Sequence, residues 1–466
     1  MLALDYLRRS RKTTPATEMK ALEYINVGYQ RLLTFEVAGG GFDWYGHAPA
    51  NVVLSAYGLL EFQDMSKVYE IDGRILQRTR DWLFRQQQAD GSWEVPPRTA
   101  WSWSGLSGKL VVTAYVAWSL GEAGYRGPEL DRAAVWLKKN LSQAQDLYSR
   151  ALAANALAVW NPKDKDLADL LAQIDDKKVV DAENRCCSWR QDGSTAFYAK
   201  GEYASVETTA LVALAMMKTP DYANTVNQSL AYLARMKDAR GTWGSTSATI
   251  LALKAILRGM GAQEQKGTAK VKVSINGRSQ DVSITPDQAD VLHLVDLPGA
   301  AVQGRNKIEI EVEGESAAMY QVVGRYWLPW NEVAPEERSP LSVKVSYDNT
   351  SISKDDVLRA QVRMQYHGKA PTFMIVLDLG IPPGFVVDTS GFEKMVEKKT
   401  IDRFGATSRQ ITLYFGTIQP EQVVEFGYEL RPKYPIRAKT PKTTAYEYYS
   451  PDRKGESRPV EIEVKD

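Results

Sequence analysis

The spacing of hydrophobic residues divides the chain into two parts. Up to about residue 261 they recur every three or four positions, as Ala21, Tyr24 and Ile25 do, which is the spacing of one helix face. Farther along, they alternate with polar residues, which is typical of strands with one buried face. The sequence therefore predicts a helical first part and a β second part. Alternation is clearest at Val271, Val273 and Ile275 and at Ile308, Ile310 and Val312.

The helical part repeats one pattern of turn and helix. A short turn with glycine and an aromatic residue precedes a segment that is small and apolar almost all round. Glycine permits the positive backbone angle of such a turn, and a segment that is apolar on all sides should be buried. The turns and the segments after them are residues 39–44 and 52–60, 90–93 and 111–120, 188–194 and 206–214, and 240–243 and 247–253.

The length of the repeat indicates how the helices are arranged. Its spacing of about fifty residues is the length of two helices with their loops. Residues 141–160 supply only the second helix of one further repeat. Outer amphipathic helices that alternate with buried inner ones about five or six times would form a closed ring. The sequence therefore predicts an α/α toroid.

One turn has a counterpart in known enzymes. Residues 85–93, RQQQADGSW, resemble the QW repeat of terpene cyclases, which share the α/α toroid architecture. In those proteins the glutamine and the tryptophan tie a helix end to its turn. The resemblance implies the same role for Gln87 and Trp93. Because the turn recurs here without acidic or metal-binding groups, we interpret it as structural.

Carboxylates in the loops of a toroid raise a second hypothesis, a glycan-active enzyme. Glycosidases need two carboxylates that face each other across a cleft, although most loop carboxylates are only solvated. The candidates, all expected in loops at one end of the ring, are Asp43, Asp90, Glu94, Asp192 and Glu202.

Other reactive side chains point to no known site. Asp175 and Asp176 resemble a solvated helix end rather than the dense acidic cluster of a cyclase. His47 has no serine or cysteine beside it in a nucleophile setting, and we expect it to pack on aromatic residues in a loop. Cys186 and Cys187 are adjacent, which suits neither an ordinary disulfide nor, with 3 histidines in the chain, a metal-ligand set. We expect buried thiols, and the sequence predicts no cofactor, no metal and no catalytic residue.

Charge and hydropathy argue against two further classes of protein, those that bind nucleic acid and those that span or bind a membrane. Lys and Arg number 58 and Asp and Glu 57, so no overall field favours nucleic acid or an anionic membrane. No apolar run reaches the roughly 18 to 20 residues that cross a bilayer. Residues 1–6 lack the basic then apolar order of a signal peptide. We therefore expect a soluble chain with no nucleic-acid partner, no membrane span and no signal peptide.

A longer resemblance covers the whole chain. Residues 4–7 (LDYL), 21–33, 39–42, 54–60 and 82–93 resemble, in order and spacing, the thioester domain of the alpha-2-macroglobulin family, above all its bacterial and macroglobulin-type members. Residues 269–328 resemble the second part of the CUB domain that follows it. Residues 339–466 resemble the C-terminal receptor-binding domain, with strands expected at 341–345, 373–379, 410–415 and 445–449.

The resemblance implies a multi-domain α plus β fold. Residues 1–264 would form the α/α toroid, which is thioester-domain-like and N-terminally truncated. Residues 265–328 would be a β-sandwich segment, the second part of a CUB-like domain, and 329–338 a linker. Residues 339–466 would be a receptor-binding-like macroglobulin β-sandwich.

The motif that carries the family's chemistry is absent from the sequence. In the family, the Cys and Gln of a Cys-Gly-Glu-Gln motif close an internal thioester, which acylates lysines of a protease that has cut a bait region. Neither that motif nor any Cys-x-x-Gln occurs in residues 1–466. We expect this chain alone to form no thioester and to trap no protease.

The resemblance nevertheless implies a function. The chain would be the C-terminal part of a broad-spectrum endopeptidase inhibitor, as a truncated or split gene product or paired with a separate N-terminal chain. Its partners would be proteases, its location extracellular or periplasmic, and it would not be an enzyme. A third hypothesis is a non-covalent binding protein that uses the faces of the toroid and the sandwich.

Two secondary features of the family can be compared residue by residue. Some complement relatives carry a histidine that speeds acyl transfer, but the matching residues 96–104 contain none. Residues 391–399 resemble the helix on which vertebrate receptor-binding domains carry a lysine pair for an endocytic receptor. Lys394 matches one lysine, Ser390 stands at the other, and Lys398 and Lys399 follow. The competing interpretation is an ordinary charged helix face.

Overall fold

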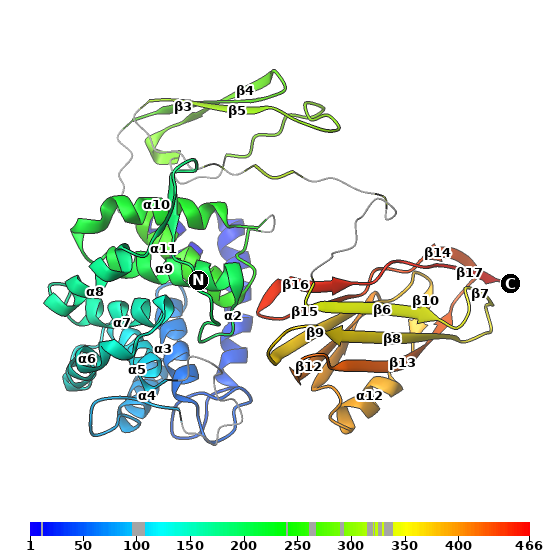
Figure 1. Cartoon of the computed structure of the whole chain (residues 1–466), viewed down its shortest axis with the longest axis horizontal. Coiled ribbons are helices and arrows are strands. Elements are labelled where there is room, and N and C mark those ends of the chain that lie inside the picture. Colours follow the sequence, from blue (N-terminus) through cyan, green and yellow to red (C-terminus); the bar gives the residue numbers. More distant parts are fainter. Residues whose placement is uncertain are drawn as a thin grey trace. The chain divides into compact units, whose positions relative to one another are not determined.

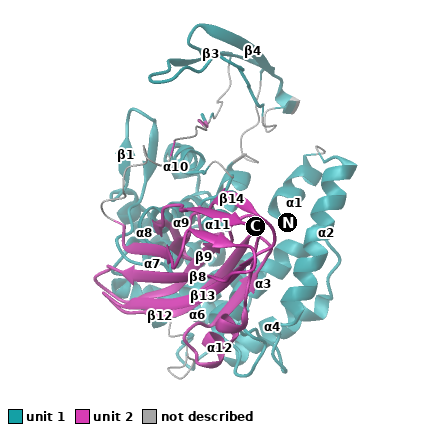
Figure 2. Cartoon of the chain, turned by 90° about the vertical axis from the view of Figure 1, so that its right-hand side faces the viewer, with its two compact units in different colours: residues 1–243, 247–322 teal, residues 244–246, 323–466 magenta. Residues whose placement is uncertain are grey.

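The computed structural model describes residues 1–10, 13–95, 108–238, 241–260, 267–288, 293–314, 320, 322–324, 329 and 339–466. The chain forms two compact units, one of residues 1–243 and 247–322 and the other of residues 244–246 and 323–466 (Figure 2). Residues 96–104, and the predicted linker 329–338 apart from Pro329, lie outside the described residues.

Two kinds of helix alternate along the first unit (Figure 1). One kind is buried on almost every side, because its sequence is apolar all round. The other kind is amphipathic and buries one stripe. The buried helices are α3 (Val52–Ser66), α5 (Lys109–Glu122), α7 (Leu147–Trp160) and α9 (Gly201–Met216), and α11 (Thr246–Met260) continues this series but is only partly buried. The amphipathic helices are α2 (Pro15–Leu33), α4 (Gly73–Arg85), α6 (Pro128–Asn140), α8 (Lys165–Asp175) and α10 (Ala223–Arg235), and the shorter ones are α1 (Leu2–Arg9), η1 (Leu141–Gln143) and η2 (Pro220–Tyr222).

The buried helices form the inner layer of a ring. α3 packs on α5, α5 on α7, and α7 on α9. An ion pair between Lys254 Nζ and Asp64 Oδ2, 3.0 Å apart, ties α11 back to α3. Inner and outer helices therefore alternate around a ring, and the predicted α/α toroid is confirmed.

Tryptophan holds the turns before α5, α9 and α11 in the same way, whereas in the first turn the N–H of Phe42 donates to Ser55 of α3 at 2.8 Å. The indole Nε1 donates to a carbonyl near the end of the preceding helix, and the main-chain N–H donates to a threonine hydroxyl on the inner helix that follows. Gly91 is needed in its turn because its φ is +93° and a Cβ there would lie 2.6 Å from the carbonyl oxygen of Arg132. Trp93 bonds Leu83 O (2.7 Å) and Thr113 (2.9 Å), Trp189 bonds Ile174 O (2.7 Å) and Thr209 (3.1 Å), and Trp243 bonds Leu233 O (2.6 Å) and Thr249 (3.0 Å).

Two small sheets complete the first unit. Strands β1 (Val179–Asp181) and β2 (Cys186–Ser188) form a hairpin before α9. Strands β3 (Ala269–Ile275), β4 (Arg278–Ile284) and β5 (Ile308–Glu313) form an antiparallel sheet in the order β4-β3-β5, with η3 (Pro286–Gln288) after β4. The strands predicted at residues 271–275 and 308–312 are present, although their apolar residues are only partly buried or are exposed.

The second unit is a β-sandwich whose sheets share one core (Figure 1). Its sheets run in the orders β10-β13-β8-β6, β11-β12-β9-β15-β16 and β14-β17-β7. The strand expected at 445–449 ends at Glu447, since a turn at the next two residues leads into β16. The elements are β6 (Leu341–Tyr347), β7 (Ser351–Ser353), β8 (Leu358–Tyr366), β9 (Thr372–Gly380), β10 (Phe385–Val387), α12 (Ser390–Glu397), β11 (Arg403–Ala406), β12 (Gln410–Ile418), β13 (Val423–Pro432), β14 (Ile436–Lys439), β15 (Thr444–Glu447), β16 (Ser450–Glu456) and β17 (Glu461–Lys465).

Candidate functional site

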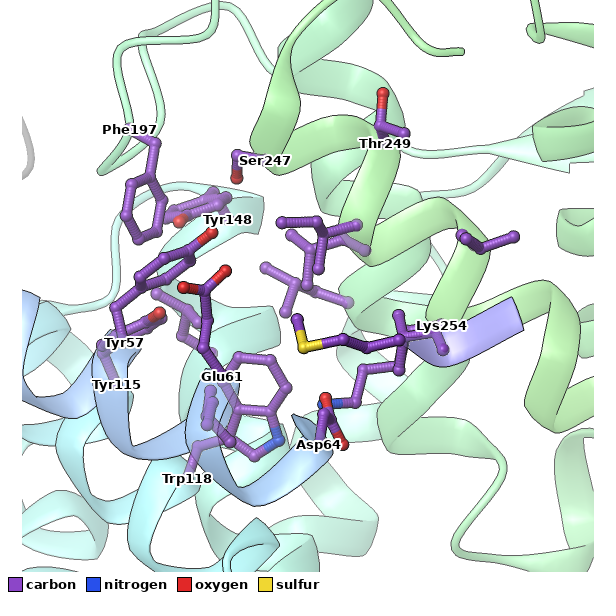
Figure 3. Close-up of a pocket in the computed structure, with 18 of the residues that line it drawn as sticks. Tyr57, Glu61, Asp64, Tyr115, Trp118, Tyr148, Phe197, Ser247, Thr249 and Lys254 are labelled. Atoms are coloured by element: carbon purple, nitrogen blue, oxygen red, sulfur yellow. The ribbon is translucent and has the colours of Figure 1, made fainter. Parts of the chain in front are cut away.

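A cavity of about 220 Å³ lies inside the helical ring (Figure 3). Side chains of α3, α5, α7, α9 and α11 line it, together with Phe197 and the first three residues of the chain. The lining is mostly apolar and includes Leu60, Leu152, Leu211 and Ile250. An apolar, concave site with a few polar groups is the usual form of a binding site.

One wall of the cavity is aromatic. The rings of Tyr57 and Tyr115 lie 5.5 Å and 5.7 Å from the ring of Phe197, and Tyr115 lies 5.9 Å from Trp118. Tyr148 completes this wall. Aromatic faces packed at these distances make a rigid apolar surface. The indole Nε1 of Trp118 is buried and has no hydrogen-bond partner among the residues that the structure describes.

Glu61 is the acidic group of this wall. It follows Tyr57 by one helical turn on α3, which places both on one face. Burial raises the pKa of the Glu61 carboxyl, and the nearby charge of Asp64 raises it further, against the hydrogen bond that Tyr57 donates. Burial also raises the pKa of Tyr57, and the negative charge of Glu61 adds to that shift. Burial is thus the main cause that disfavours the charged form of both groups.

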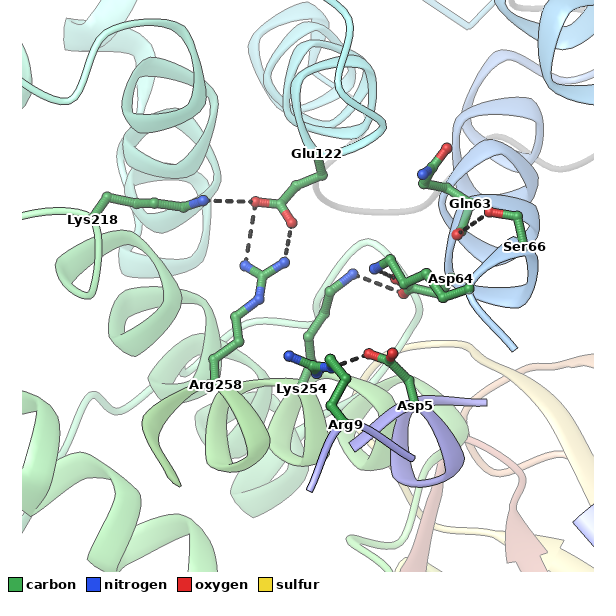
Figure 4. Close-up of polar contacts among 10 residues, drawn as sticks. Asp5, Arg9, Gln63, Asp64, Ser66, Glu122, Lys218, Lys254 and Arg258 are labelled. Carbon is green, nitrogen blue, oxygen red and sulfur yellow. Dashed lines mark hydrogen bonds and ion pairs between the residues drawn. The ribbon is translucent and has the colours of Figure 1, made fainter. Parts of the chain in front are cut away.

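Asp64 and Lys254 also line the cavity (Figure 3), and they form a buried ion pair (Figure 4). Asp64 Oδ2 lies 3.0 Å from Lys254 Nζ, and Asp64 Oδ1 lies 2.7 Å from Lys67 Nζ. Burial alone would raise the pKa of Asp64, but the two lysines outweigh it and lower that pKa. Burial lowers the pKa of Lys254 even beside Asp64. The pair links α3 with α11 and also supplies the cavity's charged edge.

A second ion cluster lies close to the first on α11 (Figure 4). Glu122, at the end of α5, accepts hydrogen bonds from the guanidinium of Arg258 and lies 3.3 Å from Lys218 Nζ. Burial would raise the pKa of Glu122, but these cations lower it to about 2. Both clusters hold α11 against earlier helices by charge.

The cavity lining suits binding better than bond cleavage. Its hydroxyl groups on α11, Ser247 and Thr249, have no histidine in the lining to activate them. Within the described residues, no group of three or more His, Cys, Asp or Glu side chains is arranged to hold a metal. No helix in that part of the chain has the length and hydropathy of a membrane-spanning segment.

Three of the carboxylates that were candidates for a glycosidase, Asp43, Asp90 and Glu202, each have a local structural role or position. Asp90 bonds Ser92, Lys109 and Trp136, so its carboxylate fixes the turn before Trp93. Asp43 accepts the N–H of Tyr45 in its own loop at 3.0 Å. Glu202 does not lie in a loop as expected: it is in the first turn of α9, where its charge complements the helix dipole.

The remaining predicted groups lie outside the cavity. His47 is in a loop as expected but is exposed. Cys186 and Cys187 are buried free thiols in β2, as expected, and burial raises the pKa of Cys187 to about 11. Lys394, Lys398 and Lys399 are exposed on and just after α12, which Phe392 anchors in the sandwich core.

Sequence reasoning missed the residues of the cavity. Tyr57 and Trp118 lie inside segments predicted to be buried helices, and Glu61, Asp64 and Lys254 follow the ends of two of those segments. A signal was present, because Glu61, Asp64 and Lys254 are charged residues where α3 and α11 continue past their apolar segments. Charges in such positions require partners, and the spacing of Glu61 and Asp64 on α3 identifies their common face.

Known proteins that are similar in sequence match nearly the whole length of this chain. A family model described as the A-macroglobulin TED domain matches residues 1–258, and one described as the A-macroglobulin receptor binding domain matches residues 371–458. Ovostatin of Gallus gallus is 23% identical over 469 residues, which cover 96% of this chain and 31% of ovostatin. Thioester-containing protein 1, allele R1, of Anopheles gambiae is 22% identical over 97% of this chain and 33% of its own length. The chain thus spans about a third of the length of these relatives.

Solved structures show the same fold. The crystal structure of native alpha-2-macroglobulin from Escherichia coli, from domain MG7 to the C-terminus, has a TM-score of 0.63 and 15% identity, and covers 100% of this chain and 73% of that one. Salmonella alpha-2-macroglobulin reacted with methylamine has a TM-score of 0.62 and 15% identity, and covers 98% of this chain and 28% of that one.

Proposed function

The chain belongs to the alpha-2-macroglobulin family, and we propose that it serves as the C-terminal region of a broad-spectrum protease inhibitor that traps its target. In this proposal the chain is not an enzyme, and it works outside the cytoplasm, in the periplasm or the extracellular space. Further polypeptide of the family's type, on the same or another chain, would supply the bait region.

The observation that carries the proposal is the order of its parts. A toroid of the thioester-domain type is followed by a receptor-binding sandwich, and the similarity extends over 96% of the chain. An independent glycan-active enzyme would need opposed carboxylates. The candidate Asp90 is instead occupied with Ser92 and Lys109 in its turn.

The sheet β4-β3-β5 supports the need for further polypeptide. Val271, Val273 and Ile310 point to one face of it, and Lys270 and Lys272 to the other. The apolar residues stay partly or largely exposed within the described part of the chain; Val312, for example, is 43% exposed. A three-stranded sheet with an apolar face normally buries that face against a second layer. We infer that a β layer of the inhibitor's other domains covers it.

Covalent capture would depend on residues outside 1–466. Both cysteines of the sequence lie in β2, and neither is part of a Cys-Gly-Glu-Gln motif. Methylamine cleaves internal thioesters and should therefore leave the mass of this chain unchanged. Covalent incorporation of methylamine into residues 1–466 would contradict this part of the proposal.

The proposal can be tested on the protein in its native source. Antibodies against residues 339–466 should detect a species whose mobility in a native gel changes when active trypsin is added. Trypsin that has been inactivated beforehand is the control and should leave the mobility unchanged, because trapping follows cleavage. If the species hydrolyses glycans, and Glu94→Gln or Glu202→Gln abolishes this activity, the enzyme hypothesis replaces the inhibitor. A stable complex with inactivated trypsin would favour the non-covalent binding protein.

A further inference from the structure

One outer helix of the ring is apolar on its solvent side. Helix α2, at the edge of the first unit (Figure 2), carries Met19, Tyr24 and Val27, which are 72%, 67% and 65% exposed. Among the residues described for the other outer helices α4, α6, α8 and α10, the only large hydrophobic side chain exposed in this way is Val135 of α6, at 49%. Several large apolar side chains exposed together on one helix are typical of a contact surface.

The three exposed residues share one side of α2. Because a helix turns by about 100° per residue, Met19 and Tyr24 stand about 80° and 60° to either side of Val27. The buried residues Ile25 and Tyr29 stand about 160° from Val27, on the side that packs into the unit. We call the side of α2 that is centred on Val27 its outer face.

Two opposite charges flank Val27 at equal distances along the helix. Glu23 lies four residues before it and Arg31 four residues after it, about 6 Å away in each direction. Both are exposed, and neither forms an ion pair within the part of the chain that the structure describes. The guanidinium of Arg31 lies over the ring of Phe35, 5.4 Å from its centroid. Both charges are therefore accessible to a partner that docks on the outer face.

A two-fold axis through Val27 makes the outer face complementary to itself. In two antiparallel α2 helices related by this axis, a residue before Val27 meets the residue equally far after it on the other copy. Each Glu23 would then face the Arg31 of the other copy, and the two Val27 side chains would meet on the axis. Met19 would lie beside Phe35, which is partly exposed.

We propose that the outer face of α2 binds a second copy of this chain, with the two α2 helices antiparallel about an axis through Val27. The contact would bury Met19, Tyr24 and Val27 of both copies and form two Glu23–Arg31 ion pairs. One helix face is smaller than the roughly 800 Å² per partner of a stable complex, so the dimer should be weak and depend on concentration.

Exchange of charges tests this symmetry in sedimentation experiments on the whole chain. All chains carry Val312→Lys, which suppresses association through the sheet β4-β3-β5. Glu23→Arg or Arg31→Glu alone should weaken dimerisation at least about tenfold, because both ion pairs become repulsive. An equimolar mixture of the two variants should dimerise again, because every pair then joins Arg and Glu. A mixture that associates no better than the separate variants would overturn the proposal.

A cysteine on the axis locates the contact. Because the two copies of residue 27 would face each other, Val27→Cys should form a disulfide-linked dimer under mild oxidation. Val135→Cys, at the exposed position of α6, is the control, and the native Cys186 and Cys187 are buried. Equal cross-linking of both variants, or none of Val27→Cys with its helical content intact, would refute the assignment. No protease is present, so a negative result leaves the proposed inhibitor function untouched.

Discussion

The pKa of the buried Glu122 carboxylate, which nearby cations lower, determines how the stability of the chain depends on pH. Its pKa falls from 4.5 to about 2 because Arg258 and Lys218 bind the ionised form. A lowered folded-state pKa contributes stability above the unfolded value, and this stability is lost as the pH falls toward the folded value. The window for Glu122 is therefore between about pH 4.5 and pH 2.

Replacing Glu122 should remove this part of the pH dependence. Between about pH 5 and pH 2 the helical unit should lose about 3 kcal/mol more stability than its Glu122→Gln variant. Urea unfolding followed by circular dichroism at several pH values measures the difference. If the free energies of unfolding of the two proteins changed in parallel with pH, Glu122 would not be held ionised by its partners.

Lys254 should be more sensitive to substitution than Lys67, although both bind Asp64. Lys254 is buried, so Lys254→Met removes the buried partner of Asp64 Oδ2, leaves Asp64 only its pair with Lys67, and should cost about 3 kcal/mol. The side chain of Lys67 is 43% exposed, and Lys67→Met should cost less than about 1 kcal/mol. Equal losses in urea unfolding would contradict the role of Lys254 in closing the ring.

The thiol of Cys187 should react slowly in the folded chain. Its pKa of about 11, against 9.0 for the ordinary thiol, lowers the thiolate fraction near neutral pH about a hundredfold. Iodoacetamide should therefore modify Cys187 only after unfolding, as followed by mass spectrometry. Rapid labelling of Cys187 in the native chain would show that the segment around β2 opens and exposes the thiol to solvent.

At the scale of elements, the tryptophan turns join consecutive helices of the ring. Trp93→Phe retains the apolar ring but removes the hydrogen bond to Leu83 O, which should cost about 1 to 2 kcal/mol because that carbonyl is buried. Trp160 is a suitable control, because its indole N–H donates to the carboxylate of Asp131 at an exposed position. Trp160→Phe should therefore cost only about 0.3 kcal/mol. Thermal unfolding of both variants compares them, and similar losses would argue against a special role for the turn.

The sheet β4-β3-β5 should make the isolated chain self-associate. Val312→Lys places a charge on its apolar face and should lower association at high concentration, whereas Glu311→Lys puts the same residue on the opposite face. Sedimentation at several concentrations distinguishes the two variants. If both variants self-associate as much as the parent chain, the apolar face does not mediate the association. The inferred β layer would then lose its support.

The toroid could be predicted from the sequence, but the cavity could not. Periodicity and the recurring glycine turns determine where helices begin and end, since these features are local. The inward direction of Glu61 and the pairing of Asp64 with Lys254 depend on how α3 and α11 meet, at a separation of 190 residues. The sequence does not indicate that Glu202 is helical, because the N-cap of α9 is Lys200, which is not a usual cap residue and makes no side-chain cap hydrogen bond.

At the scale of the whole molecule, the chain combines two familiar units with two surfaces that are open in the described residues. The cavity beside α1 and the apolar face of β4-β3-β5 both lie in the first unit. The exposed apolar face of the sheet supports the proposal that the chain functions within a larger inhibitor.

The substrate size that a bound protease accepts tests this account most directly. A protease enclosed by an inhibitor still cleaves small peptides, because they diffuse to its active site, but it cannot reach large proteins. Trypsin incubated with the native species that carries residues 339–466 should therefore lose activity on casein and keep it on a small amide substrate. Equal loss of both activities, or no loss of either, would contradict the claim that the chain belongs to a protease trap.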